Sequence, residues 1–474
     1  MERIKKYEEI LISLNEAVWD YAELKFNEYK SSNILQKALV KEGFKIEKGI
    51  GEMETAFIAS AGKGNPVIGI LAEYDALSGL SQKAGVSFPI PREEKSNGHG
   101  CGHNLLGVGA VGAAFLIKDY LEENNKKGTI ILIGCPAEEG GSGKAYLARA
   151  GVFDNLDAAL TWHPAGGNAV ITGSFQANCQ VYFRFKGISS HAASSPHLGR
   201  SALDAVELMN VGVNYMREHM ESTDRIHYAV TDTGGISPNV VQNHAEVLYL
   251  IRSVNTEKVK KLYERVCKIA EGASLMTETE VEIIFDKACS NVISNSVLEE
   301  VLYEAMNKVY LPEYNEEDLK FAKEIKKTIT ENDLSSDLSL MTADMVVKKE
   351  AIKKYKEKVM ADFVLKHEHK DIIIPGSSDV GDCSYVVPTA QFAGACFVPG
   401  TPGHSWQMTT QGKEKTAVKG MFYAAEVLAE SAKKLIENPE ILKAAKKEFI
   451  EQTQGQKYIC PIPIEIKPNM NRKK

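Results

Sequence analysis

Apolar residues recur along the chain in two spacings, which predict helices alternating with buried strands. Helical spacing of Ile10, Leu14 and Val18 predicts a helix over about residues 4–42, and further helices are expected over 104–123 and 415–437. Short continuous apolar runs in PVIGILAEYDAL, GTIILIGCPAEEGG and DAALTWHP predict buried strands. This alternation indicates an α/β fold.

From about residue 178 the pattern changes to shorter alternating strands with amphipathic helices between them. Their order is β-α-β-β-α-β, which is typical of a ferredoxin-like module. We therefore predict an inserted domain at 180–290, between two parts of a catalytic domain at 1–179 and 291–474. The Lys- and Glu-rich stretch 312–370 predicts solvated helix, and no chemistry is assigned to it.

Net charge, apolar content and cysteine content limit which partners and which cellular location we expect. The 474 residues carry a net charge of −7, so no basic surface for nucleic acid is expected. The charged N-terminus does not resemble a signal peptide, and no apolar stretch is expected to span a membrane. Eight scattered cysteines indicate free thiols in a reducing compartment, so we expect a cytoplasmic protein.

One glycine-rich stretch, NGHGCGHN, carries a cluster of candidate metal ligands. His99, Cys101 and His103 alternate with glycine, and alternation in an extended segment places residues i, i+2 and i+4 on one face. Imidazole and thiolate together suit zinc, and the ligand types also allow manganese. The alternative is a glycine-rich turn whose histidines are merely polar.

Further candidate ligands follow the predicted strands. Asp75 ends the first strand, the pair Glu138 and Glu139 ends the second, and His163 ends the third. Ligands bind at the carboxyl ends of strands in open α/β sheets. In an adjacent pair, one carboxylate can hold a cation while the other takes a proton from water. The alternatives are a turn or cap for Asp75 and a solvated surface for the glutamate pair.

The predicted inserted domain carries three polar residues in unusual places. His191 and Asn239 lie in loops, where a structural or turn role is the alternative. Arg252 lies in the apolar strand LYLIRS, where a guanidinium is costly unless it meets an anion. That anion could be a substrate carboxylate, which arginine can hold with two parallel hydrogen bonds, or it could be Glu246 of the same domain.

The motifs, in the order EYDAL, NGHGCGHN, CPAEEGG, TWHP, SSHAA, GGISPNVV, PGSSDVGDCS and PGTPGHS, span nearly the whole chain. Together they resemble the di-metal aminoacylase and carboxypeptidase superfamily, in particular its amidohydrolase branch. The resemblance implies an α/β catalytic domain with a central sheet flanked by helices, interrupted by a ferredoxin-like lid that also dimerises.

The resemblance also implies roles for single residues. Two divalent cations, Mn²⁺ or Zn²⁺, would be bound by Cys101, His103, Glu139, His163 and His404. Glu138 would be the general base, Asp75 an orienting aspartate, and His191 a lid histidine that reaches a neighbouring subunit's site. Asn239 and Arg252 would hold the substrate carbonyl and carboxylate. The chain departs from the commoner branch pattern at Glu73 and Asn104, where that pattern has aspartate.

The implied function is a metal-dependent amidohydrolase acting on an N-acyl amino acid such as p-aminobenzoyl-glutamate. The implied assembly is a homodimer, or a heteromer with a related A-type subunit, formed through the lid. Three alternatives stay open: a dipeptidase or aminoacylase acting on other amides, a catalytically silent partner subunit, and a metal-free hydrolase with Cys101 as nucleophile.

Overall fold

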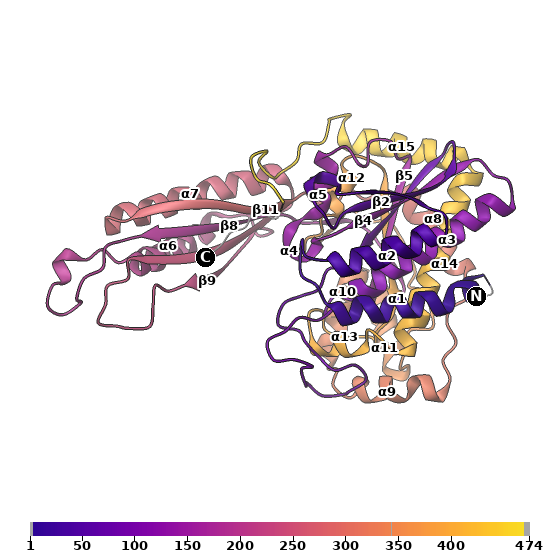
Figure 1. The fold of residues 1–474 in the computed structure, drawn as a ribbon, viewed down its shortest axis with the longest axis horizontal. Helices are drawn as coiled ribbons and strands as arrows, with labels where there is room; N and C mark the ends of the chain where they lie inside the picture. Colours follow the sequence, from indigo (N-terminus) through magenta and orange to yellow (C-terminus); the bar gives the residue numbers. More distant parts are fainter. Residues whose placement is uncertain (1–2, 343, 469–474) are drawn as a thin grey trace.

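The computed structural model describes residues 3–342 and 344–468. Besides a small two-stranded sheet, two larger sheets organise the chain, and they lie at opposite ends of the molecule (Figure 1). The larger sheet is flanked by helices, and the smaller one carries two helices of its own. The predicted α/β class with a central sheet flanked by helices is therefore confirmed.

The larger sheet has seven strands in the order β1-β2-β4-β3-β5-β13-β6. Its centre, β4-β3-β5-β13, is parallel, while β1, β2 and β6 pair antiparallel at the two sides. The strands are β1 (Lys45–Lys48), β2 (Phe57–Lys63), β3 (Val67–Glu73), β4 (Gly128–Cys135), β5 (Ala158–Ala165), β6 (Ala169–Ile171) and β13 (Thr389–Ala395). Because the central strands are covered on both faces, they are nearly continuous apolar runs.

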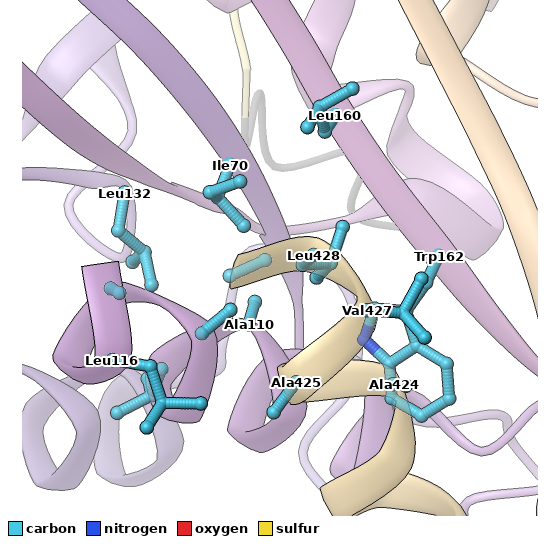
Figure 2. Close-up of a cluster of buried hydrophobic side chains, with 14 of the residues drawn as sticks. Ile70, Ala110, Leu116, Leu132, Leu160, Trp162, Ala424, Ala425, Val427 and Leu428 are labelled. Carbon is cyan, nitrogen blue, oxygen red and sulfur yellow. The ribbon is translucent and has the colours of Figure 1, made fainter. Parts of the chain in front are cut away.

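Two long helices, α3 (His103–Glu123) and α14 (Lys415–Glu437), pack together on one face of this sheet. Figure 2 shows Ala110 of α3 and Ala425 of α14 beside Ile70 and Trp162 of the sheet. Both helices match the predicted ranges to within one residue. Contrary to our expectation, α3 is long and apolar enough to span a membrane, but 89% of its apolar window is buried inside the protein, as in a core helix.

The predicted N-terminal helix is wrong in one respect, because it is interrupted. The chain forms η1 (Ile4–Tyr7), α1 (Glu8–Tyr21) and α2 (Tyr29–Lys41). Ala22 adopts a left-handed conformation with φ 41° and ends α1. The residues between the two helices, 22–28, lack helical apolar spacing, which the expectation of one continuous helix overlooked.

The smaller sheet has the order β11-β8-β10-β9, and all of its pairs are antiparallel. Its elements follow the predicted β-α-β-β-α-β order: β8 (Ala177–Lys186), α6 (Ala202–Met216), β9 (Arg225–Asp232), β10 (His244–Ser253), α7 (Thr256–Thr277) and β11 (Glu280–Cys289). Helices α6 and α7 pack on the sheet through a buried apolar cluster. The domain boundaries at 179/180 and 290/291 stay predictions.

The charged stretch 312–370 forms α9 (Glu316–Lys326), α10 (Glu331–Met341) and α11 (Met345–Glu357). These helices are more than a solvated surface. Leu338 of α10 and Tyr355 of α11 are buried in an apolar cluster with Ala393 and Ala395 of β13.

The remaining elements are short segments and the helices of the C-terminal half. They are η2 (Ile50–Glu52), α4 (Glu138–Gly141), α5 (Gly143–Arg149), β7 (Ser174–Phe175), η3 (Pro196–Leu198), η4 (Arg217–His219), α8 (Ser296–Lys308), β12 (Ile373–Ile374), α12 (Val380–Ser384), α13 (Trp406–Gln411) and α15 (Pro439–Thr453). The described end of the chain packs on the protein, since the guanidinium of Arg149 donates to the carbonyl oxygens of Pro463 and Ile466.

Candidate metal centre and adjoining cleft

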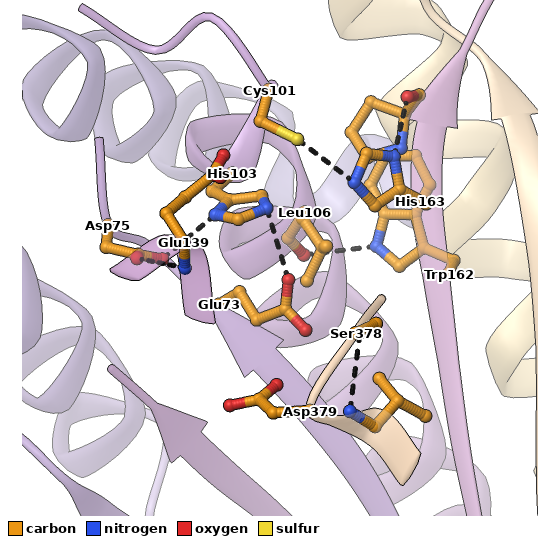
Figure 3. Close-up of polar contacts among 12 residues, drawn as sticks. Glu73, Asp75, Cys101, His103, Leu106, Glu139, Trp162, His163, Ser378 and Asp379 are labelled. Atoms are coloured by element: carbon orange, nitrogen blue, oxygen red, sulfur yellow. Dashed lines mark hydrogen bonds and ion pairs between the residues drawn. The ribbon is translucent and has the colours of Figure 1, made fainter. Parts of the chain in front are cut away.

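The five predicted metal ligands come together at the carboxyl ends of the central strands. Their donor atoms form two groups whose members lie within 4.8 Å of one another, and the two groups share one thiol. The first group is Cys101, His103 and His163, and the second is Cys101, Glu139 and His404. Figure 3 shows the Cys101 sulfur directed toward the His163 ring, with His103 and Glu139 beside it.

Two glycines allow the loop that carries Cys101 to pack closely against neighbouring side chains. Gly102 has φ +83°, and a Cβ there would lie 3.0 Å from the ring of Phe397. A Cβ at Gly100 would lie 2.3 Å from the Leu80 side chain. The third member of the predicted cluster, His99, does not join the donor groups. Its Nε2 lies 3.0 Å from the carbonyl oxygen of Val18, and burial lowers its pKa to about 4.

Asp75 fixes the orientation of His103. The Nδ1–H of His103 donates to Asp75 Oδ1 at 2.9 Å, and Asp75 Oδ2 accepts from the backbone N–H of Glu139 at 2.9 Å. Burial alone would raise the pKa of Asp75, but the hydrogen bond and charge of His103 lower it on balance. With Nδ1 bonded to Asp75, Nε2 is the ring nitrogen of His103 that can bind a cation, as in carboxylate–histidine–metal arrangements.

The other two histidines present one ring nitrogen each to the same centre. His163 Nδ1 is hydrogen-bonded to the carbonyl of Pro164 at 2.9 Å, which directs Nε2 toward Cys101 Sγ at 3.4 Å. Burial lowers the pKa of His163 to about 4, so its imidazole is neutral, as a metal ligand must be. His404, in the loop after β13, places Nε2 3.5 Å from Glu139 Oε2.

Two buried polar atoms that form no hydrogen bond at the centre fit a bound cation. His103 Nε2 and Glu139 Oε1 are buried and accept or donate no hydrogen bond in the described part of the chain. Burial raises the pKa of Glu139 to about 8. Buried groups of this kind are costly unless they are paired or bind metal. The mixture of sulfur, nitrogen and oxygen donors suits a divalent ion of the zinc type.

The sequence did not indicate the buried ion network beneath the centre. Lys144, with a fully buried side chain, places Nζ 2.6 Å from Glu73 Oε1 and 2.5 Å from Asp379 Oδ1. Its backbone N–H also donates to Asp379 Oδ2 at 2.9 Å. Burial would lower the pKa of Lys144, but the two carboxylates raise it well above the usual value. Glu73 Oε2 in turn lies 3.2 Å from His103 Nε2, so the network meets the predicted ligands.

A cleft of about 280 Å³ opens beside the centre, between the two sheets. Its lining includes Glu138, Glu139 and His404 from the metal centre and Arg252 from β10 of the smaller sheet. Burial and the charge of Glu73 raise the pKa of Glu138.

The alternative partner for Arg252 is wrong. Glu246 is paired with Arg184 at 2.8 Å, whereas Arg252 Nη1 donates to Ser377 Oγ at 3.0 Å. The guanidinium is therefore directed to the cleft side of β10 without a carboxylate to neutralise it among the described residues.

The structure does not bring His191 and Asn239 to this cleft. Both are exposed, and they lie next to each other, because the N–H of Ala192 donates to the carbonyl of Asn239 at 3.0 Å and His191 bridges to Val240. Neither lines the cleft within one chain.

Fold and donor set together define a class. Residues 69–434 match the model of Peptidase family M20/M25/M40, which is more than half of the chain, so the chain belongs to this family. The superfamily predicted from the motif order is confirmed, and with it the class of enzyme, a metal-dependent hydrolase of amide bonds.

Two relatives and one solved structure narrow the comparison. Over 453 residues the chain is 47% identical to the B-type subunit of p-aminobenzoyl-glutamate hydrolase of Escherichia coli (strain K12), covering 95% of this chain and 94% of the relative. It is 29% identical over 233 residues to the A-type subunit of that hydrolase from the same organism, covering 47% and 52%. A dinuclear metal-binding peptidase of the M20 family from Bacillus subtilis has the same fold, with TM-score 0.55, 17% identity, and coverage of 91% and 99%.

Proposed function

We propose that the protein hydrolyses the amide bond of an N-acyl amino acid with a free carboxylate, with p-aminobenzoyl-glutamate as the substrate. The observation that carries this proposal is the composition of one cleft. Its lining combines the glutamate pair and His404 with Arg252, which forms no ion pair with any residue that the structure describes. The name of the 47% identical relative supports the same substrate.

Cys101, His103, Glu139, His163 and His404 would hold two divalent cations, Mn²⁺ or Zn²⁺, with the shared Cys101 between the two donor groups. When bound, the cations would lower the pKa of water and polarise the substrate carbonyl. Asp75 would keep His103 in the tautomer that leaves Nε2 free.

Glu138 would act as the general base and then as the acid. It lines the cleft next to the donor groups, and its raised pKa suits a carboxylate that takes a proton from water. The same carboxyl group would then pass that proton to the leaving amine nitrogen. Arg252 would hold the substrate carboxylate through its planar fork.

A neighbouring chain would complete the site. His191 and Asn239 are exposed and away from the cleft of their own chain, which supports a role at a neighbouring subunit's site. The partner would be a second copy of this chain or a related A-type subunit, docked through the 180–290 lid. All eight cysteines are free, which supports a cytoplasmic location.

The pKa shifts of Cys101 and His163 do not support the alternative in which Cys101 is the nucleophile. Burial and the charge of Glu139 raise the pKa of Cys101, and the low pKa of His163 makes it a poor base for that thiol. A nucleophilic cysteine needs the opposite shift.

Paired substitutions of the two adjacent carboxylates test the proposal. Glu138→Gln should retain metal and lower kcat by at least ~10²–10⁴-fold, the range for general base catalysis. Glu139→Gln should lose metal, as measured by elemental analysis of purified protein. The assay is cleavage of p-aminobenzoyl-glutamate, with wild-type activity abolished by a chelator and restored by Mn²⁺ or Zn²⁺. Full activity of a metal-free preparation, or metal loss in Glu138→Gln, would contradict the assignment.

A further inference from the structure

A second cation lines the same cleft as Arg252. Lys287 of β11 lies there, and its ammonium donates to the backbone carbonyl of Glu139 at 3.2 Å. Neither Lys287 nor Arg252 forms an ion pair with any residue in the described ranges 3–342 and 344–468. The Nε of Arg252 is in addition buried without a hydrogen-bond partner. Two unpaired cations beside one small cleft are costly unless an anion neutralises them.

A β-bulge is what directs Lys287 to the cleft. Phe285 pairs with Val181 and Lys287 with Gln180, so Asp286 is an extra residue in β11. Without this insertion, the alternation of side chains along β11 would turn Lys287 to the opposite face of the sheet. Asp286 is held by the side-chain amide of Gln180, which donates to it at 2.6 Å.

The two cations are placed to hold two anionic groups of one small molecule. In the strand register, Arg252 of β10 lies opposite Asn178 of β8, and Lys287 of β11 lies opposite Gln180 of β8. Strand β8 therefore separates the two cationic residues, which are offset by two residues along it. Strand spacing and rise place their Cα atoms about 12 Å apart. The side chains of Asn178, Gln180, Arg252 and Lys287 all line the cleft, so they form one polar floor on this sheet.

We infer that Lys287 binds a second carboxylate of the substrate, which makes N-acyl dicarboxylic amino acids the preferred class. This inference rests on the proposed function, in which Arg252 holds the α-carboxylate. The side-chain carboxylate of a glutamate would then meet the Lys287 ammonium. The alternative is a purely structural lysine that tethers the main chain at Glu139.

Two substrates of equal size separate these roles: p-aminobenzoyl-glutamate and p-aminobenzoyl-glutamine. The wild-type enzyme should prefer the glutamate. Lys287→Met should lower kcat/KM for the glutamate roughly 10- to 100-fold, the value of one hydrogen bond to a charged group, and should change the glutamine little. Lys287→Arg should keep the preference. Lys186→Met, which removes an exposed lysine at the other end of β8, should change neither value.

The ratio of the two kcat/KM values is measured within one preparation, so it is independent of the fraction of folded enzyme. A ratio that falls toward one only when the charge at position 287 is lost supports the inference. Equal losses on both substrates, or loss of metal from Lys287→Met, would overturn it and identify a tether. A wild-type enzyme that cleaves both amides with no preference would overturn it while leaving the amidohydrolase proposal intact. Failure of the wild-type enzyme on both amides would refute the proposed function itself.

Discussion

Replacing Lys144 by methionine should destabilise the protein severely, because two buried carboxylates would lose the cation that they share. The Lys144 side chain is 0% exposed, and those of Glu73 and Asp379 are 4% and 1% exposed. Methionine fills much of the same volume but carries no charge. Removing one partner of a buried ion pair costs about 3–5 kcal/mol. We expect the free energy of unfolding to fall by that amount near neutral pH.

Equilibrium unfolding in urea, followed by tryptophan fluorescence on chelator-treated protein, measures this loss. Trp19 and Trp162 are buried in the part of the chain that surrounds the larger sheet, so the signal reports on the region that contains Lys144. The matched control is Lys118→Met, which removes an ammonium that is paired with the exposed Glu122. A surface pair of this kind contributes at most about 1 kcal/mol.

The pH dependence of the stability of Lys144→Met provides a second test of this prediction. Burial raises the pKa of Asp379 even in the presence of Lys144, and removal of the ammonium should raise it further. The folded variant then binds more protons than the unfolded chain, so its stability increases as the pH falls. The deficit of Lys144→Met should therefore shrink between pH 7.5 and 5.5. A loss no larger than that of the control, or a deficit that grows on acidification, would refute the reasoning.

Other substitutions test single contacts of the centre. Asp75→Asn should weaken metal binding by about 10- to 100-fold, the usual effect of losing a carboxylate that orients a ligating histidine. The reason is that the amide can favour the wrong tautomer of His103. An unchanged affinity in a titration with Mn²⁺ would contradict this prediction. Mixing inactive His191→Ala with inactive Glu138→Gln should restore part of the activity, because some mixed dimers would hold one intact composite site. Absence of recovery in verified mixed dimers would show that His191 serves its own chain or none. Arg252→Lys should lower kcat/KM for a free-carboxylate substrate more than for its carboxamide, since lysine loses the two-point geometry.

Strand ends were predictable from the sequence because a buried strand and the polar residue that follows it are adjacent in the chain. Asp75, Glu138 and His163 each follow an apolar run, and parallel pairing brings those ends to one edge of the sheet. The participation of Lys144 was not predictable in this way. Its partner Asp379 lies 235 residues away, and no local pattern encodes such a contact.

Local sequence patterns also failed to predict the structure at two positions. The alternation in NGHGCGHN suggested that His99 joins Cys101 and His103, but the loop turns at the glycines and directs His99 to the backbone of α1. The bulge at Asp286 is likewise invisible in the apolar pattern of β11, although it decides which face Lys287 occupies.

The position of β13 has a consequence for how the protein is made. This strand pairs with β5 on one side and β6 on the other, so the larger sheet stays incomplete until residues 389–395 have left the ribosome. Until then β5 presents an open edge, the kind of surface on which nascent chains aggregate. His404 follows later still, so the second donor group cannot close during most of synthesis. The second donor group can therefore assemble only late in synthesis or after it, and a chain that ends before residue 404 would lack one donor of that group.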